Sequence, residues 1–293
     1  MADKIIAFSW PYLAAEVAQP LLEAAEAQAK VRGYEYLKCG IKEAKLDQQL
    51  AEINQWIAMG VTGITILPID ANAMGPVVEK AHQSGVQAVA GYADHIPSED
   101  GWMGWNDAQG CGIVAGLATL HVLNNYGGVA RIAALTDSPL TQRSKRRVMD
   151  CIQLIIDGVP QGELVVHEEA VFAADALTKT QQILQAHPDI NVIICVADDG
   201  CSGVVQGMKL AGKKPEDIWV AGYDGAKQPL TMVKTGEMVG AVAALPLVGV
   251  GNMAIDLPAD LIEGKGVKNR MIDYEVVTNG DDAKIDELLA VYE

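Results

Sequence analysis

Apolar runs of strand length alternate with segments of helical period along almost the whole chain of 293 residues. The expected strands are Ile5–Ser9, Tyr34–Cys39, Gly63–Leu67, Val86–Ala90, Val129–Leu135, Leu164–Glu168, Asn191–Val196, Ile218–Gly222, Val239–Ala243 and Met271–Val277. The expected helices are Ala14–Val31, Leu46–Met59, Ala73–Ser84, Gly110–Asn124, Gln142–Asp157, Ala174–Ala186, Cys201–Leu210, Pro229–Thr235, Gly249–Glu263 and Ala283–Leu289. This alternation predicts an α/β protein in which right-handed βαβ units build parallel sheets.

The alternation is interrupted once, in a stretch with Pro97, Gly101 and Gly104 that we expect to be a loop, and it restarts near residue 129. Each half carries about four to six βα units, which predicts two doubly wound, Rossmann-like domains. Ligands of such sheets bind beyond the carboxyl ends of the strands. The residues that follow the strands are therefore the candidates for a binding site.

The charge balance argues against nucleic acid as a partner. Asp and Glu total 38 and Lys and Arg total 22, which leaves a formal net charge of −16, whereas a duplex-binding surface needs a strong basic field.

No stretch of about 18 apolar residues runs without a charge, so no bilayer-spanning segment is expected. Met1 to Lys4 lead directly into the first strand without a secretory signal. The chain is therefore either a cytoplasmic protein or the mature part of an exported one with a replacement Met.

The cysteines give no sign of a disulfide framework or a metal site. The chain has five of them, at Cys39, Cys111, Cys151, Cys195 and Cys201. An odd number cannot all pair with one another, and the spacings match no metal-ligand pattern. We expect most of them to be buried small apolar side chains.

Signatures of catalysis are missing. The first strand ends in Ser9-Trp10-Pro11-Tyr12 rather than in a glycine-rich dinucleotide loop, and the chain has neither a Walker phosphate loop nor a G-x-S-x-G elbow. The five histidines suggest no Ser/His/Asp set. We therefore expect no enzyme, no catalytic residue and no cofactor.

The strand ends carry aromatic rings, carboxylates and one arginine instead. The candidate ligand-binding residues in this set are Trp10, Tyr12, Tyr92, Asp94, Asn106, Arg143, Phe172, Asp198 and Asp224. Flat rings stack on the CH faces of a sugar, while carboxylates and a forked guanidinium direct hydrogen bonds to its hydroxyls. This combination predicts a small polyhydroxylated ligand.

Some of these residues have a structural alternative. Aspartate at a strand-to-helix junction is commonly an N-cap, which stabilises a helix by about 1 kcal/mol. We expect capping at Asp70, and it is the alternative for Asp198, Asp199 and Asp224. Trp10 has the alternative of a lid over the core.

Four cations stand in the first turns of one predicted helix, where the helix dipole disfavours positive charge. They are Arg143, Lys145, Arg146 and Arg147. Carboxylates from neighbouring strand ends, such as Asp198 and Asp224, could offset this cost. We expect Arg143 to contact the ligand and the other three cations to form a solvated basic face.

Four sequence blocks resemble the type I periplasmic sugar-binding proteins, typified by ribose-binding protein and sharing their core with LacI-type repressors. The blocks are Gly60-Val61-Thr62-Gly63-Ile64 with Pro68-Ile69-Asp70, Ala186-His187-Pro188-Asp189-Ile190 with Ala197-Asp198-Asp199, Val220-Ala221-Gly222-Tyr223-Asp224-Gly225, and Ala244-Leu245-Pro246. The resemblance extends from about Ile5 to Val277. It implies an N-terminal lobe of residues 1–107 and 245–273 and a C-terminal lobe of residues 108–244 and 274–293.

The resemblance also implies a function and its partners. In this family, lobes joined by a three-segment hinge close around a ligand in the cleft between them. The protein would then deliver a sugar or polyol to an ABC transporter permease. The expected location is periplasmic or extracytoplasmic after removal of a signal peptide, with membrane contact only through the permease or a removed anchor. We expect a monomer.

Five site residues are carried over from the family pattern: Ser9 as the first pocket wall, Arg143 as the arginine that grips the sugar, Phe172 as a pocket aromatic, and Asp198 and Asp224 as polar contacts. The chain departs from the pattern at Tyr92, Val17, Ala18 and Ala244, where the family has Asp, two aromatics and Gln. Asp94 lies two residues after Tyr92, which stands where the family has Asp. We expect Trp10 and Tyr12 to replace the two aromatic rings that are absent at Val17 and Ala18. The altered polar set favours a pentose, tetritol or pentitol over a hexopyranose. The alternative is the ligand-sensing core of a LacI-type regulator that lacks its DNA-binding domain.

Overall fold

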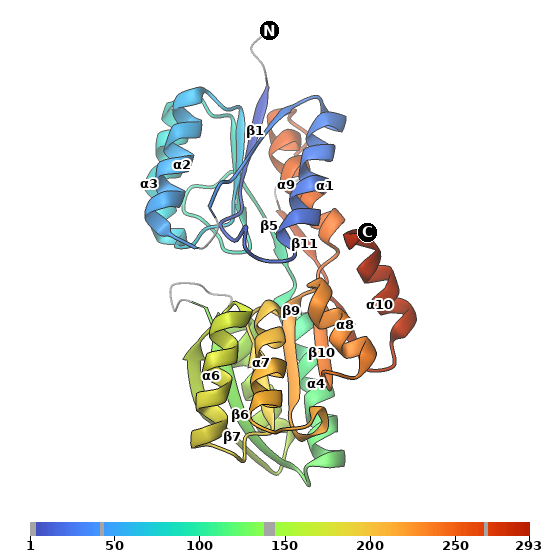
Figure 1. Cartoon of the computed structure of the whole chain (residues 1–293). Coiled ribbons are helices and arrows are strands. Elements are labelled where there is room, and N and C mark those ends of the chain that lie inside the picture. Colours follow the sequence, from blue (N-terminus) through green and yellow to red (C-terminus); the bar gives the residue numbers. More distant parts are fainter. Residues whose placement is uncertain (1–3, 42–43, 138–143, 267–268) are drawn as a thin grey trace. The chain divides into compact units, whose positions relative to one another are not determined.

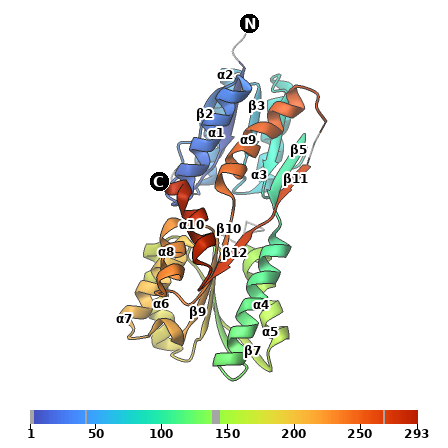
Figure 2. The same ribbon diagram turned by 90° about the vertical axis from the view of Figure 1, so that its right-hand side faces the viewer.

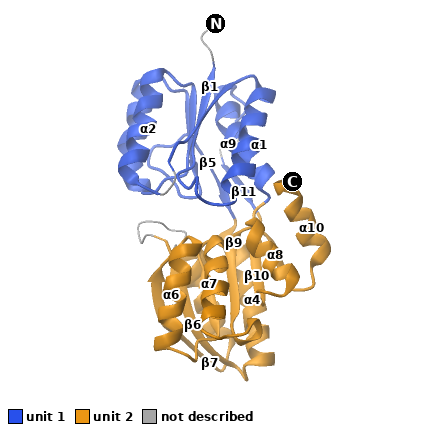
Figure 3. Ribbon diagram, viewed as in Figure 1, with its two compact units in different colours: residues 1–105, 246–272 blue, residues 106–245, 273–293 orange. Residues whose placement is uncertain are grey.

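The computed structural model describes residues 4–41, 44–137, 144–266 and 269–293, which fall into two compact units (Figures 1 and 3). Unit 1 comprises Met1–Trp105 and Pro246–Ile272, and unit 2 comprises Asn106–Leu245 and Asp273–Glu293. The chain therefore passes from one unit to the other three times, after residues 105, 245 and 272.

Unit 1 is a doubly wound α/β unit. Its described strands form one six-stranded sheet of order β11-β5-β4-β3-β1-β2, in which every neighbouring pair is parallel. The strands are β1 (Ile5–Ser9), β2 (Glu35–Lys38), β3 (Gly63–Ile66), β4 (Ala88–Tyr92), β5 (Gly101–Trp105) and β11 (Asn269–Ile272). The helices α2 (Leu46–Met59) and α3 (Ala71–Gln83) cover one face, and α1 (Ala18–Arg32) and α9 (Leu247–Ile262) cover the other (Figure 1).

Unit 2 repeats this architecture. Its described strands form a six-stranded sheet of order β12-β10-β9-β8-β6-β7, parallel except where β12 pairs with β10. The strands are β6 (Val129–Thr136), β7 (Gln161–Glu169), β8 (Val192–Cys195), β9 (Trp219–Asp224), β10 (Gly240–Ala244) and β12 (Glu275–Thr278). Figure 2 shows α4 (Asp107–Asn125) and α5 (Asp150–Gly158) on one face, and α6 (Ala173–Ala186), α7 (Asp199–Leu210) and α8 (Lys227–Thr235) on the other. The last helix, α10 (Asp282–Leu289), packs on α8.

Burial explains why the strands read as apolar runs. Helices cover both faces of a parallel sheet, so neither face can be polar. In unit 1, Ile64 and Val89 are completely buried in one hydrophobic cluster, and in unit 2 Ile193 and Val220 are buried in another. The predicted α/β class with two doubly wound units is confirmed.

Two predicted elements are wrong. The stretch around Gly101 and Gly104 is the strand β5 rather than a loop. A Cβ atom at Gly104 would lie 2.2 Å from the Trp102 ring, so glycine serves side-chain packing here and not a turn. The predicted strand Met271–Val277 is two strands, because β11 belongs to the sheet of unit 1 and β12 to the sheet of unit 2.

Candidate functional site

Three predicted ligand-binding aromatics meet in unit 1. The Trp10 ring centroid lies 6.4 Å from that of Tyr12 and 6.0 Å from that of Tyr92, and Phe8 packs edge-on against Tyr92 at 5.7 Å. All four rings are buried. The structure therefore brings Trp10, Tyr12 and Tyr92 together at the carboxyl ends of β1 and β4, as one aromatic cluster.

Ser9 lies at the same edge of the sheet, and its side chain is hydrogen bonded within the protein. It is completely buried, and its hydroxyl accepts a hydrogen bond from Gln49 Nε2 at 2.9 Å. The Gln49 amide also donates to the carbonyl of Leu67 at 2.7 Å and accepts from the amide of Ile69 at 3.0 Å. Ser9 and Gln49 thus tie together the segments that follow β1 and β3, and the contact of Ser9 with a ligand stays a prediction.

Asp94 follows β4 through a tight turn. The amide of Asp94 donates to the carbonyl of Tyr92 at 2.9 Å, and Ala93 between them has a φ of 66°. A positive φ is strained for alanine, and such strain is concentrated at functional sites. The turn holds the buried Asp94 next to the aromatic cluster.

An arginine that we expected in solvent is the centre of the site in unit 2. The Arg147 side chain is 1% exposed. Its Nε donates to Asp107 Oδ1 at 3.1 Å, and its Nη1 donates to Asp224 Oδ1 at 2.8 Å and to the carbonyl of Val196 at 3.3 Å. The guanidinium also lies over the ring of Tyr223, 5.4 Å from its centroid. The prediction of a solvated basic face is wrong for Arg147.

Arg147 lies on a segment with unusual helical winding. Residues Ser144–Met149 form a π-helix that continues into α5, and π-helical turns occur frequently at functional sites. Arg146 on this turn keeps 35% exposure while its Nε donates to Asp107 Oδ2 at 2.7 Å. Arg143, the arginine that we predicted to grip the ligand, lies outside the described residues.

Asp107 is the carboxylate that holds the arginines. It is buried in the first turn of α4, where the helix dipole favours negative charge. Besides both arginines, it accepts a hydrogen bond from the hydroxyl of Tyr274 at 2.8 Å. Burial lowers the pKa of Arg147, but the charges of Asp224 and Asp107 raise it by more. The guanidinium therefore stays charged inside the unit.

Asp198 is a buried carboxylate whose two oxygens differ in their contacts. Its Oδ2 accepts from the amides of Gly225 and Ala226, both at 2.8 Å. Among the residues that the structure describes, no donor reaches its Oδ1. Burial raises the pKa of Asp198 well above its usual value, and the negative charges of Asp224 and Asp199 add to this effect. A ligand hydroxyl is the kind of group that could satisfy Oδ1.

The remaining candidates differ in role. Asp224 has a φ of 108°, a second strained backbone at a strand end. Asn106 caps α4, because its side chain accepts from the amide of Gln109 at 3.3 Å, and it also donates to Asp273 Oδ1 at 2.8 Å. Phe172 is half-buried just before α6.

The predicted cap at Asp70 is confirmed. Its Oδ1 accepts from the amides of Asn72 and Ala73 at 2.9 Å and 3.2 Å. Asp198, by contrast, makes no side-chain hydrogen bond to the first turn of α7. Its carboxylate therefore does not cap that helix.

Members of both sets of residues lie where the strand order reverses. In unit 1 the reversal falls at β1 and β3, and in unit 2 at β6 and β8. Doubly wound sheets bind ligands beyond the carboxyl ends of the strands at such points. Trp10 follows β1, while Val196, which Arg147 contacts, and Asp198 follow β8.

Gly222 offers a test of how tightly Asp198 is packed. A Cβ atom at this position in β9 would lie 2.7 Å from both Asp198 Cα and Cys201 Sγ. We expect Gly222→Ala to lower the free energy of unfolding by about 1–3 kcal/mol, as overpacking does. The matched control is Gly112→Ala in α4, where nothing lies within 4 Å, which should stabilise by about 0.5–1 kcal/mol. Urea unfolding measures both, and equal effects would contradict the packing argument.

In the part of the chain that the structure describes, none of the helices is both long and apolar enough to cross a membrane. Within the same residues no group of three or more His, Cys, Asp or Glu side chains could hold a metal ion. All five cysteines are free and buried, which confirms the prediction that most are core residues.

Residues 6–266 match the model of the family described as periplasmic binding protein domain. The ribose import binding protein of Bacillus subtilis is 26% identical over 253 residues, which cover 83% of this chain and 76% of that protein. The xylitol-binding protein of Mycolicibacterium smegmatis is 24% identical over 230 residues, covering 75% of this chain and 62% of that protein.

A solved structure shares the fold over nearly the whole chain. The carbohydrate transporter solute binding protein of Agrobacterium radiobacter, in complex with D-arabinose, superposes with a TM-score of 0.87 at 21% identity. The match covers 99% of both chains. At this identity the likeness supports the architecture and leaves the ligand to be argued from the residues.

Proposed function

Because the chain belongs to the periplasmic binding protein domain family, we propose that it is the solute-binding component of an ABC-type sugar importer. Its ligand would be a monosaccharide or a small polyol, with a pentose, tetritol or pentitol favoured. The observation that carries the proposal is the polar set of Arg147, Asp107, Asp198 and Asp224 in unit 2, in which the first three side chains are buried and Asp224 is 15% exposed.

This polar set suits a neutral ligand rich in hydroxyls. The charge of Arg147 is already balanced by two carboxylates, so a charged ligand is not needed for neutrality. Asp198 Oδ1 offers an acceptor in a buried setting. A buried polar group that a ligand leaves unpaired costs about 1–3 kcal/mol, which makes such a site selective for the hydroxyl pattern.

The aromatic cluster of unit 1 supplies the complementary chemistry. Rings such as Trp10, Tyr12 and Tyr92 stack against the CH groups of a sugar or polyol. We propose that these rings and Asp94 act on the same ligand as Arg143, Phe172, Asp198 and Asp224, through closure of the two lobes. A ligand favours a closed state only by its higher affinity for that state.

Relatives support the coarse assignment. The names of the curated relatives refer to ribose import and to xylitol binding, a pentose and a pentitol, and the family implies a periplasmic or extracytoplasmic location and a permease as partner. The protein would capture its ligand without transforming it. The alternative, a LacI-type sensor core, gains no support from the comparisons.

A thermal-shift screen over pentoses, hexoses, tetritols and pentitols tests the proposal. A compound at one hundred times its Kd stabilises the native state by about 2.7 kcal/mol, which corresponds to a rise in Tm of roughly 5–10 °C for a unit of this size. We expect such a rise with one or a few related compounds. Absence of any shift across the panel, or turnover of the bound compound seen by NMR, would contradict the proposal.

A further inference from the structure

The three chain crossings between the units begin or end next to the buried ion pairs of unit 2. The first crossing enters this unit at Asn106 and the third enters it at Asp273, while the second leaves it at Leu245. Asp107 and Tyr274 are therefore the second residues of their segments in this unit. Because all five residues belong to unit 2, the contacts among them lie within one compact unit.

Tyr274 anchors the third crossing. It is 3% exposed, its hydroxyl donates to Asp107 Oδ1 at 2.8 Å, and the Arg147 guanidinium lies 5.6 Å from the centroid of its ring. Burial raises the pKa of Tyr274 well above its usual value, although the charge of Arg147 opposes this, so the hydroxyl keeps the proton that it donates. A Cβ atom at Gly110 would lie 2.5 Å from the ring, which shows that the ring packs directly on the first turn of α4.

Further contacts join the third crossing to the first. The Gln109 side chain donates to the carbonyl of Tyr274 at 3.1 Å and accepts from the amide of Tyr274 at 3.0 Å. Asn106 Nδ2 donates to Asp273 Oδ1 at 2.8 Å in an exposed setting. Side chains at the start of α4 therefore hold both the backbone and the side chain of the third crossing.

The second crossing is reached through Asp224. Arg147 Nη1 donates to Asp224 Oδ1 at 2.8 Å, and the backbone carbonyl of Asp224 accepts from the amide of Leu245 at 3.1 Å. A continuous chain of contacts thus leads from Tyr274 through Asp107, Arg147 and Asp224 to Leu245. Contiguous networks of this kind carry energetic coupling between segments that are far apart in sequence.

We propose that Tyr274 is a positioning residue for closure of the two lobes, and that the Arg147 cluster, formed by Arg147, Asp107, Asp224 and Tyr274, is the common anchor of all three hinge crossings. The inference rests on the proposed function, because lobe closure belongs to that function. Hinge motion is absorbed by a few residues, so a rigid anchor beside them determines where the chain bends. A ligand hydroxyl that contacts Asp224 would then act on the hinge as well as on the binding site.

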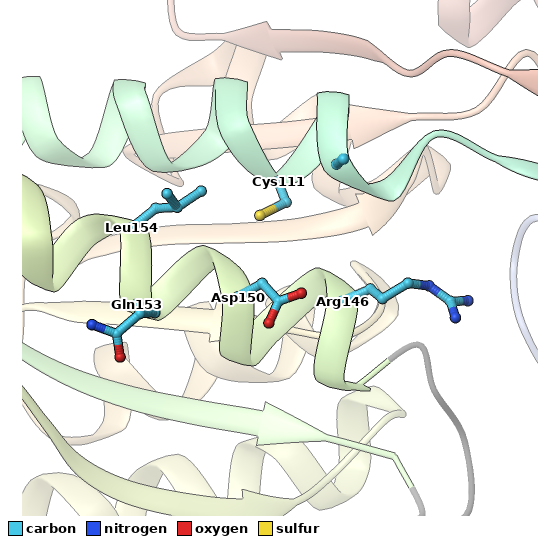
Figure 4. A pocket seen from close by; sticks show the side chains of 6 residues that line it. Cys111, Arg146, Asp150, Gln153 and Leu154 are labelled. Atoms are coloured by element: carbon cyan, nitrogen blue, oxygen red, sulfur yellow. The ribbon is translucent and has the colours of Figure 1, made fainter.

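Tyr274→Phe removes one contact from the Arg147 cluster and keeps the rest. The phenylalanine ring still packs on α4, and Asp107 retains its bonds to Arg147 and Arg146. Figure 4 shows Arg146 on the turn before α5, where it lines a pocket of about 380 Å³ together with Asp150 and Leu154. The variant therefore leaves the carboxylate paired and should fold.

Hydrogen exchange of the ligand-free protein, followed by mass spectrometry, is the direct test. A hydrogen bond to a buried carboxylate is among the stronger ones, so Tyr274→Phe should raise exchange about three- to tenfold in the peptides of all three crossings. These peptides cover residues 105–110, 243–247 and 271–276. Exchange in the core strand β8 should stay unchanged. A rise confined to 271–276, or no rise in any of the three peptides, would overturn the proposal.

Asp224→Asn tests the same chain of contacts from its other end. It removes the charge that pairs with Arg147 and keeps the backbone bond to Leu245. Because coupling is reciprocal, exchange should rise in 271–276 as well as in 243–247. A response that stays within 243–247 would contradict a common anchor, and this variant decides the question even if Tyr274→Phe folds poorly.

Two controls separate the Arg147 cluster from other contacts. Asp273→Ala removes the bond from Asn106, which bypasses the cluster, and should raise exchange in 105–110 and 271–276 but not in 243–247. Tyr126→Phe removes a hydroxyl bond to the carbonyl of Glu216 in the same unit and should leave all three peptides unchanged. Equal responses of 243–247 in Asp273→Ala and Tyr274→Phe would overturn the role of the cluster.

Failure of this inference and failure of the proposed function give different results. A thermal-shift panel of sugars and polyols in which no compound raises the Tm would contradict the proposed function. The exchange pattern is measured without ligand, so it supports or overturns the common anchor whatever the panel shows.

Discussion

Arg147→Met is expected to destabilise unit 2 by about 3–5 kcal/mol, the range for removing one partner of a buried ion pair. Methionine has nearly the volume of arginine, so the loss is mainly one of charge and hydrogen bonds. The change leaves Asp107 and Asp224 without the guanidinium that both contact. Hydrogen exchange followed by mass spectrometry, resolved by unit, measures the loss and should locate it in unit 2.

The neighbouring arginine provides the control. Arg146 donates to the same carboxylate, Asp107, but its side chain is 35% exposed. Arg146→Met should therefore cost no more than about 1 kcal/mol, as for exposed ion pairs. Adding Asp224→Asn to Arg147→Met should recover part of the stability, because it removes the negative charge that Arg147 balanced. Equal effects of the two arginine variants would contradict the central role of Arg147.

Local sequence pattern was sufficient to predict the class of fold. Parallel strands covered on both faces must be apolar throughout, and helices packed on one face must be amphipathic. These requirements act on each segment separately. Elements such as Ile5–Ser9 and Leu46–Met59 therefore have the bounds expected from the sequence.

Sheet membership could not be predicted in the same way. The split of Met271–Val277 into β11 and β12 depends on pairing with β5 and β10, far away in sequence. Nothing in the local apolar pattern separates the two strands. The strand β5 was not predicted for a related reason. Its glycines were taken to indicate a loop, whereas Gly104 leaves space for the Trp102 side chain that packs over it.

The candidate site likewise contains residues that the sequence pattern could identify and one that it could not. Asp198 and Asp224 could be singled out because they end strands, a position that the βαβ pattern defines. Arg147 was missed because several cations at the start of a helix usually indicate a face exposed to solvent. A signal was present: Arg147, Cys151 and Ile155 recur at intervals of four and are all buried, so the arginine lies on the apolar face of its helix.

Asp198→Ala is the second substitution with a large expected effect. The amides of Gly225 and Ala226 both donate to this carboxylate, and two buried N–H groups without an acceptor cost about 2–4 kcal/mol together. Asp198→Asn keeps an oxygen for these amides and should avoid most of that loss. Urea unfolding at pH 7 compares the two variants, and an equal loss in both would contradict the role assigned to the two amides.

The pH dependence of Asp198→Asn follows from the direction of the pKa shift. Burial and the charges of Asp224 and Asp199 raise the pKa of Asp198 in the folded state, so the folded protein holds this proton more tightly than the unfolded chain does. The stability that the proton contributes is complete below the unfolded pKa of about 3.9 and is lost as the pH rises through the folded pKa. Asparagine carries no such charge. The stability of Asp198→Asn relative to wild type should therefore increase with pH above about 4 and level off above the folded pKa. Urea unfolding from pH 4 to 9 measures this difference, and a difference that is flat or falls with pH would show that the buried carboxylate does not have a raised pKa.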